Sequence, residues 1–132
     1  MNNSGTFNNS GTVTNKYKLN NSGFFVLKNG GSFNNSGVLS VLTNSGSFTI
    51  DNGGSLTNSG TITNSGTGTL NNAGSFTNNL WLTNNGTLTN NGGLDNKGLL
   101  TNNKTFINNG TLNNTGSFDD LNLSDFFDGT DH

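Results

Sequence analysis

The sequence predicts an all-β fold: a single-domain parallel β-solenoid (β-helix) of triangular cross-section, with about six coils of about eighteen residues. The main observation is a period, because apolar residues recur every six positions and hold that spacing without a slip from Leu70 to Phe118. The second is composition, since Gly, Asn, Ser and Thr fill the intervening positions. A hydrophobic fraction of 27% by itself suggests disorder, but a disordered polar segment has no reason to keep a period.

Each repeat is the hexad Gly-(Thr/Ser)-apolar-(Thr/Asn)-Asn-(Asn/Ser), as in "LTNNGTLTNNG" from Leu82 to Gly92. Six is an even number, so a triplet such as Thr87-Leu88-Thr89 directs its apolar side chain to one face and both threonines to the other. The Asn-Asn-Gly that follows tolerates the backbone angles of a bend. Each hexad therefore predicts a short strand and a corner, and strands bent repeatedly in one sense form a solenoid.

The irregular spacings predict three hexads per coil, because insertions in a solenoid are expected to stack at the same corner. Extra residues follow Phe25, Leu39, Phe48 and Ile62. Three hexads per coil place the insertions after Phe25 and Phe48 at one corner and those after Leu39 and Ile62 at a second. Coils two and three are then wider than the others. The solenoid is expected to span residues 1–119, and residues 120–132 to form an acidic C-terminal cap or connector tail.

This arrangement sorts the apolar residues into three faces. Face A stacks Phe7, Phe25, Phe48, Leu70, Leu88 and Phe106. Face B stacks Val13, Phe33, Leu56, Phe76, Leu94 and Leu112, and face C stacks Leu19, Leu39, Ile62, Leu82, Leu100 and Phe118. Two positions after each apolar residue of face B there is an asparagine, which predicts an amide ladder along the axis made by Asn15, Asn35, Asn58, Asn78, Asn96 and Asn114.

Few side chains are available for catalysis or cofactor binding. There is no Cys and no Glu, and the only His is His132, so no nucleophile, base and orienting group can be assembled; we expect neither an enzyme nor a cofactor. Asp125, Asp128 and Asp131 lie close in sequence, but their spacing matches no EF-hand loop, and no metal site is predicted.

Five Lys, no Arg and a net charge of -2 argue against nucleic-acid binding. No apolar run reaches membrane-spanning length, and no export leader is recognised.

Repeats such as "GTLTNNGTLTNNG" and "GTLNNTGSF" resemble the Asn-rich hexads of β-helical stalks in bacterial surface adhesins of the filamentous-haemagglutinin and autotransporter type. The resemblance covers nearly the whole chain up to Asp119. It implies an extracellular or cell-surface structural or adhesive role, with a cell-surface or glycan ligand as a possible partner. The coil size also resembles that of bactofilins, which are cytoskeletal β-helices that polymerise end to end.

Three classes of function are compatible with these features. The first is a structural, self-assembling subunit of a filament or extracellular adhesive fibre, in which copies of the chain polymerise head to tail by axial coil stacking. The second is ice binding by Thr-X-Thr arrays, for which strands such as Thr12-Val13-Thr14 and Thr61-Ile62-Thr63 are candidates. The third is a carbohydrate-binding or carbohydrate-processing β-helix, although a hydrolase needs a pair of acids that is missing here.

Particular residues are expected to mediate assembly. Axial contacts are assigned to Phe7 at the first coil, to Phe118 at the last, and to Phe126 and Phe127 in the tail. Lateral contacts are assigned to outward-facing apolar residues of face C, namely Val38, Trp81 and Leu99.

Overall fold

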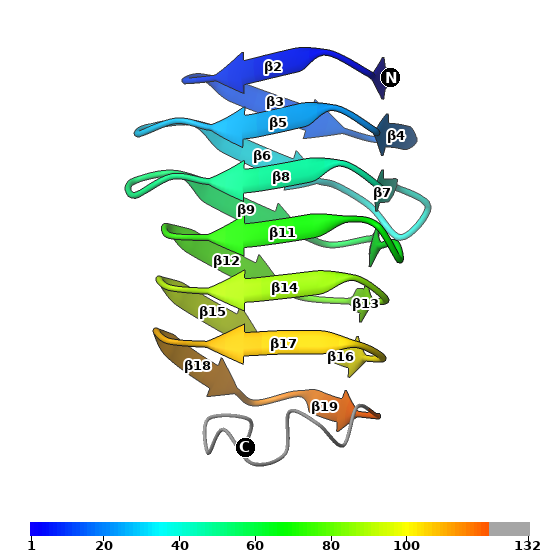
Figure 1. The fold of residues 1–132 in the computed structure, drawn as a ribbon, viewed down its shortest axis with the longest axis vertical. Coiled ribbons are helices and arrows are strands. Elements are labelled where there is room, and N and C mark those ends of the chain that lie inside the picture. The colour runs from blue at the N-terminus through cyan, green and yellow to red at the C-terminus, as the bar shows by residue number, and fades with distance from the viewer. Residues whose placement is uncertain (122–132) are drawn as a thin grey trace.

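The computed structural model describes residues 1–121 as a parallel β-solenoid of about six turns with no helix in that range, which confirms the predicted fold class. Its strands form three parallel sheets, and in Figure 1 the strands of face A form successive rungs from the N-terminus to β17. Face A contains β2 (Thr6–Asn9), β5 (Phe24–Leu27), β8 (Ser47–Ile50), β11 (Thr69–Asn72), β14 (Thr87–Asn90) and β17 (Thr105–Asn108).

Face B contains β3 (Thr12–Asn15), β6 (Ser32–Asn35), β9 (Ser55–Asn58), β12 (Ser75–Asn78), β15 (Gly93–Asn96) and β18 (Thr111–Asn114). Face C contains β1 (Asn2–Asn3), β4 (Lys18–Asn21), β7 (Val41–Asn44), β10 (Thr61–Asn64), β13 (Trp81–Asn84), β16 (Leu99–Asn102) and β19 (Ser117–Asp120). Neighbouring strands within a face are parallel, and equivalent positions of the hexad lie opposite each other, as Leu82 lies opposite Leu100.

The coils are longer in the N-terminal half than in the C-terminal half. Along face C, hydrogen-bonded asparagines of successive coils are separated by 18, 23, 20, 20 and 18 residues. The average is therefore roughly twenty residues per coil. The wider coils are those in which corner loops replace two-residue bends, as predicted.

The core is a column of apolar side chains that fills the triangular interior, with one from most strands and two each from β5 and β8. In the N-terminal half the rings of Phe7, Phe25 and Phe48 stack on face A with centroids 4.7 Å apart, and Phe33 of face B meets two of them edge-on. Offset stacking and edge-to-face contacts are the favoured aromatic geometries, so the ring quadrupoles add to the hydrophobic burial here.

The assignment of Leu39 to the core of face C is wrong. Leu42 occupies that position, opposite Leu19 and Ile62, whereas Leu39 is 83% exposed in the loop before β7. The physical reason is the ladder: two positions after Leu42 comes Asn44, which is fully buried and hydrogen-bonded, whereas two positions after Leu39 comes Val41. Burying Leu39 would place a valine where the amide is needed.

The same shift changes the corners. The insertions after Phe25 and Phe48 do stack at the corner between faces A and B, where the Gly30 N–H donates to the Gly53 carbonyl at 3.0 Å. The other two insertions occupy different corners, residues 36–40 between faces B and C and residues 65–68 between faces C and A, so the prediction of one shared corner is wrong. The loop before β7 extends outward in Figure 1.

Candidate assembly surfaces

The predicted asparagine ladder of face B is confirmed. The Nδ2 of each asparagine donates to the Oδ1 of the asparagine one coil further on, from Asn15 to Asn114, at 2.7–2.9 Å. Each of these Nδ2 groups also donates to the main-chain carbonyl of the residue that begins the face C strand of the next coil. Asn58, for example, donates to the carbonyl of Trp81 at 2.8 Å. A ladder asparagine therefore joins two coils and holds the entry to the following strand.

Two further ladders were not predicted. Face C carries an unbroken one from Asn3 through Asn21, Asn44, Asn64, Asn84 and Asn102 to Asp120. Face A carries a partial one through Asn72, Asn90 and Asn108, while Leu27 and Ile50 occupy its positions in the widened coils. The sequence indicates these ladders by an asparagine two positions after most apolar residues. On face C the pattern was hidden by the assignment of Leu39 to the core, because a valine and not an asparagine follows it two positions later.

All three ladders have the same polarity, because every amide donates toward the C-terminus. The N-terminal end of the solenoid therefore begins with side-chain oxygens that no ladder amide of residues 1–121 reaches, those of Asn3, Asn9 and Asn15. At the C-terminal end, Asn108 and Asn114 accept from the preceding coil, and their Nδ2 groups donate to no partner within residues 1–121. The N-terminal end therefore presents ladder acceptors, and the C-terminal end presents ladder donors at Asn108 and Asn114.

Asp120 ends the face C ladder differently. Its Oδ1 accepts from the Asn102 Nδ2 at 3.0 Å, as an asparagine oxygen would. An ionised carboxylate has acceptors and no donor, so Asp120 cannot pass the ladder on to a further coil.

The axial ends also expose part of the core. Phe7 and Val13 at the N-terminal end, and Leu112 and Phe118 at the C-terminal end, are only partly buried and pack against the core from one side. Phe118 meets the ring of Phe106 edge-on, with centroids 5.3 Å apart. The assignment of Phe7 and Phe118 to axial contacts stays a prediction, and Phe126 and Phe127 lie outside the described residues.

Of the three residues assigned to lateral contact, two lie where they were expected. Trp81 and Leu99 are opposite each other in β13 and β16 on the outer side of face C, and Trp81 is 48% exposed. The third, Val38, is wrongly placed, because it lies in the loop before β7 and Val41 takes the outward strand position. Val38 is nevertheless 68% exposed at the edge of the same face.

Threonine strands do not combine into a face of matched Thr pairs. Thr12-Val13-Thr14 is on face B, Thr61-Ile62-Thr63 on face C and Thr87-Leu88-Thr89 on face A. The longest threonine column is the one formed by Thr43, Thr63, Thr83 and Thr101 on face C. Its neighbouring column carries Val41, Thr61, Trp81 and Leu99, so the pairs needed for a regular hydroxyl array are interrupted.

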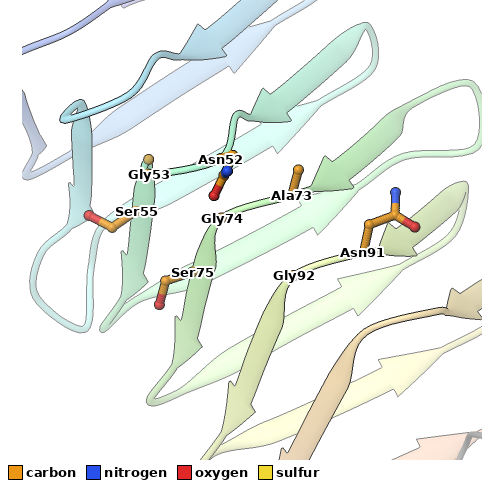
Figure 2. A pocket seen from close by; sticks show the side chains of 9 residues that line it. Asn52, Gly53, Ser55, Ala73, Gly74, Ser75, Asn91 and Gly92 are labelled. Atoms are coloured by element: carbon orange, nitrogen blue, oxygen red, sulfur yellow. The ribbon is translucent and has the colours of Figure 1, made fainter.

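A shallow groove of about 540 Å³ opens at the corner between faces A and B (Figure 2). It arises because the four-residue loop 51–54 overhangs the two-residue corners of the next coils, where Ala73, Gly74 and Gly92 are small. Its remaining side chains are hydroxyl and amide groups, with no charged or aromatic residue among those that line it.

The charged groups of the described residues do not form a reactive cluster. Lys28 pairs with Asp51 at 3.5 Å and Lys97 with Asp95 at 3.4 Å, and all four side chains are partly or largely exposed. Residues 1–121 contain no group of three His, Cys, Asp or Glu side chains placed to hold a metal ion. The same range contains no helix long and apolar enough to cross a membrane.

These features define a class of protein, an asparagine-ladder β-solenoid in which coil-to-coil contacts dominate. Comparison with protein families, with curated proteins and with solved structures finds no match for this chain. The resemblance to adhesin stalks and bactofilins therefore rests on the repeat pattern of the sequence alone.

Proposed function

We propose that this chain is a structural, self-assembling subunit that builds a filament or an adhesive fibre by axial stacking of its coils. The observation that carries the proposal is the common polarity of the ladders, which leaves acceptors at the N-terminal end and amide donors at the C-terminal end. A second copy stacked head to tail supplies to each end the partners that an interior coil already has. Because face C has seven strands and the other two faces have six, the spiral continues without overlap when the next copy is rotated by one face, so that its β1, β2 and β3 pair with β17, β18 and β19.

Hydrogen-bond matching favours this junction at two corners. The Asn108 amide would donate to Asn3 of the next copy, and the Asn114 amide to Asn9, reproducing the 2.7–2.9 Å bonds seen between interior coils. The partly buried Phe7 and Val13 of one copy would meet the core of the other, which adds apolar burial at roughly 25 cal/mol per Å². Edge strands of both ends would gain main-chain partners as well.

Asp120 makes the junction weaker than an interior boundary. On face C its carboxylate would face the Asn15 oxygen of the next copy, so two acceptors meet where every interior coil has a donor and an acceptor. Stacking therefore relies on two of the three ladders. The repulsive corner limits growth, and we expect association to depend steeply on concentration.

Three variants test the proposal. Asp120→Asn completes the third ladder and should tighten association about tenfold, since one added buried hydrogen bond and the loss of a like-sign contact are together worth about 1.4 kcal/mol. The pair Asn108→Asp and Asn114→Asp should abolish stacking. Each of these carboxylates still accepts the bond from its own chain, at 2.7 Å in both ladders, but cannot donate to a second copy.

Gly11→Ala blocks stacking without changing charge. Within the chain a Cβ at Gly11 has only the Asn9 oxygen within 4 Å, at 3.9 Å, so the subunit should fold normally. At the same corner of interior coils a Cβ would overlap the backbone of the coil before, as at Gly92 and Gly110. The methyl group would meet the same obstacle in a stacked junction. Gly93→Ala, which has no atom within 4 Å and lies on an outer strand position, is the control.

Sedimentation velocity over a concentration series measures the association of the subunits. Negative-stain imaging of the concentrated samples shows whether fibres form. The expected axial rise is roughly 29 Å per subunit, from six coils at about 4.8 Å. A monomer at every concentration, even for Asp120→Asn, would overturn the proposal. So would Gly11→Ala subunits that stack as well as the unmodified protein.

A further inference from the structure

Exposed and half-buried apolar side chains gather on one edge of face C. We call them the corner stripe: Tyr17, Val38, Leu39, Val41, Trp81 and Leu99. They come from the corner between faces B and C or from the first outward position of the face C strands. The stripe interrupts a surface that is otherwise Thr, Ser and Asn, and an axial run of exposed apolar groups is typical of an interface.

Charge is distributed unevenly along this face. Its N-terminal end carries Lys16, Lys18 and the amino group of Met1, which donates to the Lys18 carbonyl at 2.8 Å. Its C-terminal end carries Asp119, which points outward and is exposed, and Asp120. Lys28 with Asp51 and Lys97 with Asp95 form compensated pairs, and Lys104 lies at the corner between faces C and A, where its Nζ donates to the Gly66 carbonyl at 3.2 Å. Face C is therefore positive at one end and negative at the other.

We propose that face C pairs with the face C of a second copy in antiparallel orientation, about a two-fold axis that lies between β10 and β13. The inference is independent of axial stacking, because it uses a side of the solenoid and not its ends. The occupant is identified as a second copy because the face complements itself in charge and in shape.

The orientation follows from the position of the stripe. Because the stripe lies along one edge of the face, a two-fold axis parallel to the solenoid axis would bring it against the opposite, polar edge of the partner. A two-fold axis along the strand direction brings the stripe edges of the two copies into contact. It also makes their solenoid axes run in opposite directions, so the first coil of one copy lies against the last coil of the other. Only the antiparallel arrangement brings stripe against stripe.

The paired positions then match in size. Trp81 of one copy lies opposite Thr61 of the other, beside Gly60, so the largest outward side chain meets a small neighbour. Val41 lies opposite Leu99, which joins two apolar groups. At the ends, Lys18 lies opposite β19, within reach of Asp119. Each contact occurs twice, as an isologous interface requires.

The size of the interface predicts a weak pair. A face about 29 Å tall and about 20 Å wide buries roughly 600 Å² on each copy, or about 1,200 Å² in total, which is the lower end of specific interfaces. An isolated pair should therefore form only at high concentration. In a stacked fibre face C returns to the same side at every third copy, and the repeated contact raises the effective strength of pairing by multivalency.

A charge swap tests the orientation directly. In Gly11→Ala protein, where axial stacking is blocked, Lys18→Asp alone and Asp119→Lys alone should each weaken pairing at least fivefold, because each places like charges together at both ends of the interface. The double variant Lys18→Asp with Asp119→Lys restores opposite charges and should return the dissociation constant to within about twofold of the parent. A parallel pair would show no such rescue.

The apolar contact is tested with a matched control. Trp81→Thr with Leu99→Thr should abolish pairing, whereas Val26→Thr with Ile107→Thr removes outward apolar groups from face A and should leave it unchanged. The chain has no Cys, so Thr43→Cys and Thr101→Cys proteins can be mixed and treated with a short bis-maleimide. A cross-linked heterodimer is expected from the mixture, with little product from either protein alone.

Sedimentation equilibrium at up to millimolar concentration measures the pairing. Failure of the charge-swap rescue, or cross-linking of Thr43→Cys with itself in preference to Thr101→Cys, would overturn the antiparallel pair. A strictly monomeric Gly11→Ala protein would overturn lateral pairing altogether. Either result would leave the axial proposal untouched, since that proposal itself predicts that Gly11→Ala protein does not stack.

Discussion

Replacing asparagine by aspartate should destabilise the protein strongly in the interior of a ladder and only slightly at the ladder's last position. Asn58 is fully buried and makes five hydrogen bonds: its Nδ2 donates to Asn78, Trp81 and Gly60 at 2.8, 2.8 and 3.1 Å, and its Oδ1 accepts from Asn35 and Gly60 at 2.9 and 3.2 Å. Asn58→Asp keeps the shape and the two accepted bonds but removes the three donated ones.

The magnitude follows from those bonds. Two lost N–H donors, which serve the three oxygens between them, cost about 1 kcal/mol each, and the acceptor-to-acceptor contacts left with Asn78 and Trp81 raise the total to about 4 kcal/mol. For 132 residues the entropy of unfolding makes 1 kcal/mol equivalent to about 3.6 °C, so Tm should fall by about 14 °C. At the end of the same ladder, Asn114→Asp keeps its bond from Asn96 at 2.7 Å and should shift Tm by less than about 3 °C.

The pH dependence provides a second measurement. A protonated carboxyl at position 58 can donate to the Asn78 oxygen, so folding raises the pKa of the introduced group above its unfolded value of about 3.9. The folded state then binds more protons, and the stability of Asn58→Asp falls as pH rises from about 4 through the folded-state pKa. Thermal unfolding followed by circular dichroism should show the gap to the parent protein narrowing at pH 4. Equal losses for Asn58→Asp and Asn114→Asp at pH 7 would refute the reasoning.

Three further substitutions probe the core and the spacing of coils, each read by thermal or denaturant unfolding. Phe48→Ala removes a ring stacked 4.7 Å from Phe25 and should cost about 3–5 kcal/mol. Gly46→Ala would force a Cβ against the backbone of the coil before and should cost about 3 kcal/mol, while Gly5→Ala, at the same corner of the first coil with no atom within 4 Å, should cost less than about 1 kcal/mol. Gly93→Thr, on an open outer strand position, should stabilise the protein by about 0.5–1 kcal/mol.

Local pattern was enough to predict most of the fold. A period of six determines which side chains point inward, because strand side chains alternate and the number is even. The stacking of Phe25 over Phe48, the opposition of Trp81 and Leu99, and the face B ladder all follow from counting along the chain. These are contacts between equivalent positions of neighbouring repeats, for which sequence order and spatial order coincide.

Tertiary structure decided what happens where the period breaks. In "SGVLSVLTN" both Leu39 and Leu42 offer an apolar residue, and only contacts with the coils on either side, through the buried Asn44, select Leu42. The same neighbours decide where the extra residues bulge outward, and therefore where Leu39 and Val41 lie relative to Trp81. Spacing along the chain does not contain this information, because an insertion is accommodated at whichever corner leaves the coil-to-coil hydrogen bonds intact. The corner stripe is the consequence of that choice, and so is its position on one edge of face C.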